Sequence, residues 1–145
     1  CFQLREQRAL FTGDHVMGWS TSIISPPDGD MLAYMDSLHL LLERDDAIYW
    51  PTHGPCIDDT QTHVRAFIEH RKERERQIID CVEQGIHRIK EMVPRMYVGT
   101  PEFMYPAAAR SVLAAVECLV ARGDLLTDTD ISLDAEYHPG ASADA

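Results

Sequence analysis

Among the residues whose side chains can bind a metal ion, two follow apolar segments with the composition of a β-strand. Asp14 comes just after segment 2–11, and His53 comes just after segment 47–50. Carboxylate oxygen and imidazole nitrogen are both ligands of zinc-like cations. An aspartate after a strand is equally typical of a turn, and a histidine beside a glycine and a proline of a structural residue. The spacing alone leaves both interpretations open.

The segments around these two residues have the order strand, helix, strand. Residues 2–11 are expected to form one strand that runs into a turn at Gly13, and residues 47–50 form a second strand that Pro51 stops. Between them, a loop at 18–29 precedes a helix that Asp30 caps. Functional groups of a βαβ-type unit lie on the loops that leave its strands. Asp14 and His53 are therefore expected at the ends of neighbouring strands.

A long helix is expected from Asp58 or Asp59 to Gly85, with an apolar stripe along one side. Its middle section, 70–76, is alternately charged, which is typical of a solvated face stabilised by ion pairs. Within that section, His70 and Arg71 are also candidates for binding an anionic substrate group.

The rest of the sequence predicts a compact helical unit. Helices are expected at 86–96 and 107–122, and Leu125-Leu126 is expected to start a small wing. An acidic tail from residue 128 has the composition of a disordered segment. The predicted organisation is a first domain at 1–60, a connecting helix at 61–85, a winged-helix-like domain at 86–127 and a disordered tail at 128–145.

Five stretches together resemble the later motifs of the metallo-β-lactamase superfamily, in matching order and spacing. They are Leu10-Phe11-Thr12-Gly13-Asp14, Ser25-Pro26-Pro27-Asp28-Gly29-Asp30-Met31, Tyr34-Met35-Asp36-Ser37-Leu38, Pro51-Thr52-His53-Gly54-Pro55, and His70-Arg71 followed by Arg74-Glu75 and Gln77-Ile78. The last stretch resembles the β-lactamase-like protein 2 branch. The resemblance covers roughly residues 9 to 127. It implies an α/β fold, the C-terminal part of a metallo-β-lactamase αββα sandwich, followed by a small winged-helix-like α domain.

The resemblance also implies a binuclear metal centre, expected to hold two zinc ions. In the superfamily, the Asp of the Thr-Gly-Asp element bridges both ions and the His of the Pro-x-His-Gly element ligates one, and these roles transfer to Asp14 and His53. No ligand role of the family matches His15. The superfamily's H-x-H-x-D-H motif and a further ligand histidine are expected before Asp14, and this sequence does not contain them. The site is therefore expected to need a missing N-terminal half, and the chain alone to be inactive.

For the whole protein, the resemblance implies a hydrolase that uses a metal-activated water. Its substrate is expected to be a small-molecule ester, thioester or phosphodiester, with RNA as an alternative. Trp19 is a candidate for the mouth of the pocket. The alternative function is a non-enzymatic winged-helix module, at 86–127, that binds nucleic acid or protein. A net charge of −11, from 24 acidic and 13 basic residues, counts against nucleic acid. A homo-oligomer is also consistent with the sequence.

Composition gives further expectations. The chain begins at Cys1, which we interpret as a truncation or an internal cut, and its longest apolar helix candidate falls short of the roughly 20 residues that span a membrane. Four cysteines without a C-x-x-C pair predict buried free thiols in a reducing compartment, the cytoplasm or an organelle matrix. Four histidines without i, i+4 pairing are expected at the surface: His39, His63, His87 and His138.

Overall fold

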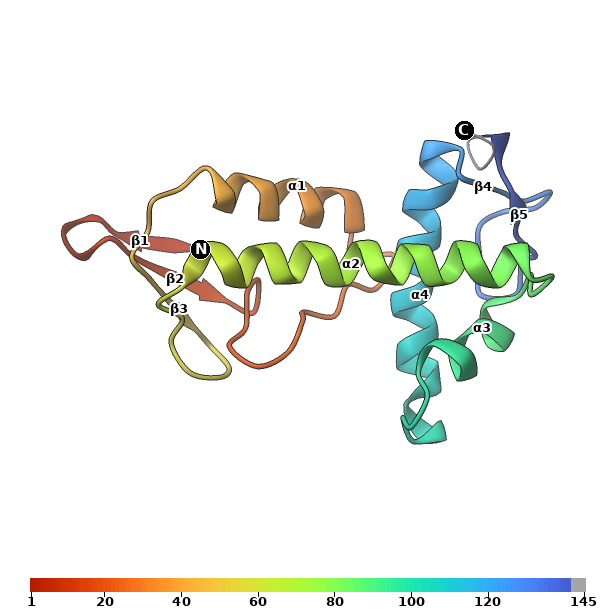
Figure 1. Ribbon diagram of the computed structural model, residues 1–145, viewed down its shortest axis with the longest axis horizontal. Coiled ribbons are helices and arrows are strands. Elements are labelled where there is room, and N and C mark those ends of the chain that lie inside the picture. The colour runs from red at the N-terminus through yellow and green to blue at the C-terminus, as the bar shows by residue number, and fades with distance from the viewer. Residues whose placement is uncertain (142–145) are drawn as a thin grey trace. The chain divides into compact units, whose positions relative to one another are not determined.

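The computed structural model describes residues 1–141, which divide into two compact units. The first unit comprises Cys1–Ile23 and Ala33–His70, and the second comprises Ile24–Leu32 and the chain from Arg71 onward. The long helix α2 (Thr60–Glu83), green in Figure 1, belongs to the first unit by its first part and to the second by its remainder.

A three-stranded sheet with the order β1-β2-β3 forms the base of the first unit. β1 (Phe2–Leu4) and β2 (Ala9–Gly13) are antiparallel and joined by the short 3₁₀ turn η1 (Arg5–Gln7). The expectation of one continuous strand over 2–11 is therefore wrong. The polar stretch after Leu4 has no buried face, and Arg8 adopts a left-handed backbone with φ of 49°, so the chain reverses there.

The strands β2 and β3 (Ile48–Pro51) are parallel, and the chain crosses between them through helix α1 (Met31–Leu42). Both strands therefore end at the same edge of the sheet. Side chains alternate between the two faces of a strand. Leu10 and its partner Tyr49 are buried on one face, whereas Phe11 and its partner Trp50 are about half exposed on the other. Other buried side chains of this unit come from α1 and α2: Tyr34, Leu38, Leu41, Val64, Phe67 and Ile68.

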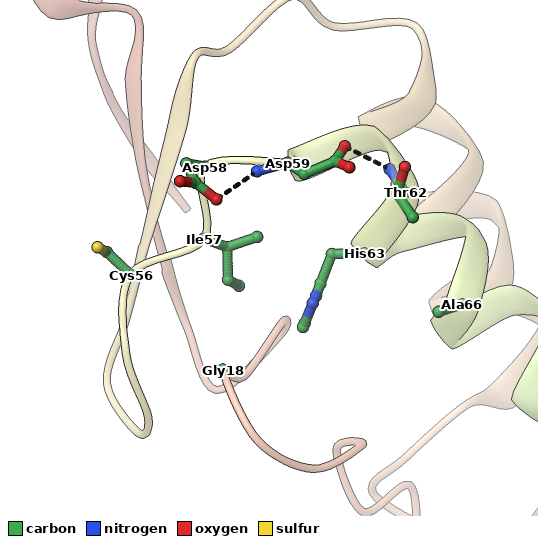
Figure 2. Close-up of a pocket in the computed structure, with 8 residues that line it drawn as sticks. All are labelled: Gly18, Cys56, Ile57, Asp58, Asp59, Thr62, His63 and Ala66. Carbon is green, nitrogen blue, oxygen red and sulfur yellow. Dashed lines mark hydrogen bonds between the residues drawn. The ribbon is translucent and has the colours of Figure 1, made fainter.

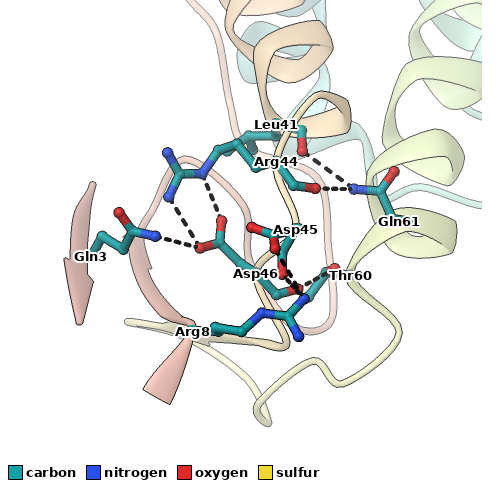
Figure 3. Close-up of polar contacts among 8 residues, drawn as sticks. All are labelled: Gln3, Arg8, Leu41, Arg44, Asp45, Asp46, Thr60 and Gln61. Carbon is teal, nitrogen blue, oxygen red and sulfur yellow. Dashed lines mark hydrogen bonds and ion pairs between the residues drawn. The ribbon is translucent and has the colours of Figure 1, made fainter. Parts of the chain in front are cut away.

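A buried carboxylate ties the start of β3 to the neighbouring elements (Figure 3). The Asp46 side chain is 1% exposed and accepts two hydrogen bonds from the Arg44 guanidinium, at 2.6 and 3.0 Å. The Gln3 amide of β1 donates a third hydrogen bond at 3.2 Å, and Thr60 at the start of α2 donates to the Asp46 carbonyl at 3.1 Å. Because a buried charge is tolerated only when its oxygens are satisfied, this network fixes the entry into β3.

The second unit contains α3 (Ile89–Met96), the 3₁₀ turn η2 (Glu102–Met104), α4 (Tyr105–Arg122) and the short strands β4 (Leu125–Leu126) and β5 (His138–Pro139). Gly123 ends α4 in the left-handed conformation, as the sequence predicts. The core combines residues of α2, α3 and α4, including Ile78, Met92, Val116 and Leu119.

Segment 128–141 packs against this unit. Its composition predicts a disordered tail, but β5 pairs with β4, and Tyr137 is fully buried. The Tyr137 amide donates to the His87 carbonyl at 2.9 Å, and Arg88 forms a bridge with Glu136. These bonds engage the backbone before Ile89, where α3 begins, three residues after the predicted start. The final four residues of the predicted tail lie outside the described residues.

Within the described residues, one helical segment, Glu102–Arg122, is long and apolar enough to cross a membrane by length and composition. The expectation that no segment reaches that length is therefore wrong. Its apolar residues have a local explanation, because Val112, Ala115 and Leu119 lie in the core of the second unit.

All four cysteines are free, as expected. Cys81 and Cys118 are buried, but Cys1 and Cys56 are exposed, so the expectation of burial holds for only two of them.

Candidate functional site

Asp14 and His53 lie next to one another at the common edge where β2 and β3 end. Nε2 of His53 is 3.6 Å from Oδ1 of Asp14, and the two side chains are 53% and 70% exposed. The parallel pairing brings them together, because residues that follow two adjacent parallel strands leave the sheet on the same side. The Thr52 amide donates to the Gly13 carbonyl at 3.1 Å and extends this pairing to the two loops.

The turn that carries Asp14 is held by side chains from the next loop and from α1. Tyr34 donates to the His15 carbonyl at 2.9 Å, and the buried Ser22 hydroxyl donates to the same carbonyl at 3.0 Å and also to that of Asp14. Nε2 of His15 lies 2.9 Å from the Ser37 hydroxyl, and its ring packs edge-on against Tyr34. His15 therefore faces α1, and its burial lowers the pKa of the imidazole.

Two glycines allow the loops after β2 and β3 to touch. The Gly18 amide donates to the His53 carbonyl at 2.8 Å. A Cβ atom on Gly54 would lie 2.7 Å from the Gly18 Cα, and one on Gly18 would overlap the Pro55 carbonyl. Gly54 also has a φ of 93°, a backbone conformation that residues other than glycine rarely adopt. The sequence shows each glycine but gives no sign that the two meet.

An open hollow of about 340 Å³ lies beside this loop contact (Figure 2). Gly18, Cys56 and Ile57 line one side of it, and α2 contributes His63 and Ala66. Asp59, also on its wall, caps α2 by accepting a hydrogen bond from the Thr62 amide at 3.2 Å. The predicted cap at this helix is therefore confirmed.

The three predicted substrate contacts have different environments. Trp19 is 72% exposed in the loop after Asp14, whereas Arg71 is buried, with 7% exposure, on α2. His70 is half-buried and lies two turns of α2, about 10 Å, beyond His63. Their role in substrate binding stays a prediction.

The donor set at the sheet edge suits part of a metal site. Asp14 offers carboxylate oxygen and His53 offers imidazole nitrogen, which are both ligands of zinc-type ions. Among residues 1–141, no group of three or more His, Cys, Asp or Glu side chains is arranged to hold a metal ion. A zinc site ordinarily has about four ligands, so these two residues fit a site that other groups complete.

A comparison with protein families gives a match within the second unit. Residues 89–129 match the family model of the beta-lactamase associated winged helix domain. The chain is 31% identical over 121 residues to a beta-lactamase-like protein 2 homolog of Caenorhabditis elegans, and the match covers 83% of this chain and 40% of the relative. It is 30% identical over 110 residues to an atrochrysone carboxyl ACP thioesterase of Aspergillus chevalieri, covering 70% of this chain and 34% of that protein.

A solved structure has the same fold as this chain. The crystal structure of a metallo-beta-lactamase family protein from Thermus thermophilus superposes with a TM-score of 0.79 at 15% identity. The match covers 95% of this chain and 44% of that one. The chain thus spans between a third and under half of the length of each of these three proteins.

Proposed function

Because this chain belongs to the metallo-β-lactamase superfamily and represents its C-terminal part, we propose that Asp14 and His53 are metal ligands of a hydrolase. The proposed centre is binuclear and zinc-type, with Asp14 bridging the ions and His53 ligating one. The observation that supports this proposal is the 3.6 Å approach of the two side chains at the edge where parallel strands end.

The two side chains have distinct tasks in this proposal. The Asp14 carboxylate supplies negative charge to two cations, and His53 supplies a neutral nitrogen donor whose position the loop contacts fix. A bound zinc-type ion would polarise a scissile carbonyl or phosphoryl group and favour ionisation of water. Trp19, exposed after Asp14, is proposed to contact substrate, and His70 and Arg71 are proposed to bind an anionic group.

A small-molecule ester or thioester is the proposed substrate class. One relative is named a thioesterase, and the net charge of −11 disfavours an RNA or another phosphodiester polymer. The charge also argues against the alternative of a nucleic-acid-binding winged helix. Three cations of that unit are already engaged in hydrogen bonds: Arg88 with Glu136, Arg110 with the loop at Ser25, and Arg122 with Glu75.

The proposed partner is the remainder of the same domain, which supplies the other ligands and covers the open face of the sheet. Phe2, Phe11 and Trp50 are register partners across β1, β2 and β3 and form one aromatic row. They are 82%, 48% and 46% exposed. An apolar face of this kind favours packing against a second sheet. We therefore expect the chain alone to be inactive.

Native mass spectrometry of the purified protein tests the metal proposal. Asp14→Ala and His53→Ala should each lose bound zinc, while His39→Ala, which removes an exposed histidine of α1, should keep it. The same spectra report whether a companion chain is present. If the wild type carries zinc, equal zinc content in all variants contradicts the assignment, and robust metal-dependent hydrolysis by this chain alone contradicts its expected inactivity.

A further inference from the structure

His63 differs from the surface position that the sequence predicts for it. It lies in the first turn of α2, is half-buried, and its ring packs against Phe67 with the centroids 4.9 Å apart. Its Nε2 atom is 2.9 Å from the Met17 carbonyl. Because a carbonyl oxygen only accepts hydrogen bonds, Nε2 must be the donor.

Two hydrogen bonds, one donated by His63 and one accepted by His53, are made by the same peptide group. The Met17 carbonyl and the Gly18 amide belong to the same peptide, and the Gly18 amide donates to the His53 carbonyl at 2.8 Å. The carbonyl and amide of a planar trans peptide point in opposite directions. The Met17-Gly18 peptide is therefore held from one side by α2 and from the other by the loop after β3.

This arrangement connects α2 to both residues of the proposed metal pair. The peptide lies three residues after Asp14, and its amide bonds the backbone of His53 itself. Hydrogen bonds in series polarise one another, so the donor on His63 strengthens the bond that Gly18 makes to His53. Gly18 in this loop and Gly54 in the loop after β3 cannot approach one another further, since their backbones are already in contact.

We propose that His63 is a positioning residue for Asp14 and His53, and that it acts through the Met17-Gly18 peptide. The proposal rests on the metal-binding function proposed above. Groups that orient metal ligands typically change metal affinity by about 10- to 100-fold when they are removed. His63 acts one peptide further out, so we expect the lower end of that range.

Two variants separate the hydrogen bond from the bulk of the side chain. His63→Leu keeps apolar volume and removes the donor, whereas the amide nitrogen of His63→Gln can reach the Met17 carbonyl and should restore the bond. His39→Leu is the matched control on α1. Unchanged circular dichroism and melting temperature verify that each variant folds, and if His63→Leu does not fold, the smaller variant His63→Ala, which also lacks the donor, takes its place.

Amide exchange of Gly18, measured by NMR on this chain without metal, reports how firmly the Met17-Gly18 peptide is held between His63 and His53. We expect Gly18 to exchange about fivefold faster in His63→Leu, the factor that corresponds to one net hydrogen bond, and at the wild-type rate in His63→Gln and His39→Leu. Titration with Zn²⁺ alone, followed by the imidazole signals of His53, should show about 10-fold weaker binding in His63→Leu.

The outcomes separate the two proposals. If Asp14→Ala and His53→Ala weaken Zn²⁺ binding but His63→Leu changes neither Gly18 exchange nor affinity, the positioning role is wrong and the metal site stands. If neither Asp14→Ala nor His53→Ala weakens binding, the metal site is wrong, and any change in Gly18 exchange then describes only loop structure. A His63→Gln variant that behaves like His63→Leu also overturns the role of the donor.

Discussion

The backbone of Gly54 lies against that of Gly18, so closely that a Cβ atom on Gly54 would come within 2.7 Å of the Gly18 Cα. This contact joins the two loops that carry Asp14 and His53. We expect Gly54→Ala to destabilise the protein by roughly 2–4 kcal/mol, because left-handed backbone strain adds to the overlap. Gly85→Ala is the control, since Gly85 has a φ of 82° and open space around it. Equal losses in chemical denaturation would show that the loop contact contributes nothing.

The hydroxyl of Tyr34 holds the turn after β2. Tyr34→Phe removes the 2.9 Å hydrogen bond to the His15 carbonyl while it keeps the buried ring. We expect a loss of about 1 kcal/mol in unfolding free energy and weaker Zn²⁺ binding at the adjacent Asp14. Tyr105→Phe, in the second unit, should leave Zn²⁺ affinity unchanged. Full affinity in Tyr34→Phe would mean that the other hydrogen bonds of the turn, among them those of Ser22 and Thr12, are enough to maintain it.

The Asp46 carboxylate should be among the most sensitive positions of the first unit. Asp46→Ala leaves Arg44 and Gln3 without their shared acceptor, and we expect it to cost roughly 2–4 kcal/mol. The adjacent Asp45 has a side chain that is 90% exposed and pairs with Arg8, so Asp45→Ala should change stability by less than about 0.5 kcal/mol. Urea denaturation of both variants measures the difference, and similar values would contradict a special role for the buried network.

The Cys118 thiol predicts a loss of stability at alkaline pH. Burial raises its pKa to about 11 in the folded chain, with the Glu75 carboxylate adding to the effect. Below about pH 8.5 the thiol is protonated in both states, and above it the unfolded state ionises first. Stability should therefore fall between about pH 8.5 and pH 11, by roughly 3 kcal/mol at the upper end.

The control for this pH dependence is Cys118→Ala, which should show a correspondingly smaller fall over the same range. Thiol labelling at pH 8 gives an independent check, because exposed Cys1 and Cys56 should react rapidly and buried Cys81 and Cys118 slowly. An identical alkaline slope in the variant would show that other groups cause the fall.

The aromatic row of Phe2, Phe11 and Trp50 should promote association of this chain when it is alone. We expect Phe11→Ser combined with Trp50→Ser to reduce self-association and hydrophobic dye binding. Phe103→Ser removes an equally apolar side chain, 82% exposed in the second unit, and should have a smaller effect. Sedimentation velocity measures both, and an unchanged distribution in the double variant would argue that this sheet face needs no cover.

The sequence by itself determined the elements that carry the candidate site. The apolar runs before Asp14 and His53 predicted two strand ends, and the helical spacing of residues from Met31 and from Thr60 predicted α1 and α2. These features depend on neighbouring residues, so local composition and periodicity were enough. The five motifs in order then indicated the superfamily, which the comparisons confirm.

Only the tertiary structure decided how these elements meet. The contact of Gly18 with Gly54, the hydrogen bond from His63 to Met17 and the burial of Tyr137 join residues that are far apart in the chain. The sequence pattern does not show which distant residues will meet. Taken alone, each of these residues is equally suited to a turn, a surface position or a tail. Parallel pairing of β2 with β3 finally brings Asp14 to 3.6 Å from His53, since two strands that run in one direction must end at one edge.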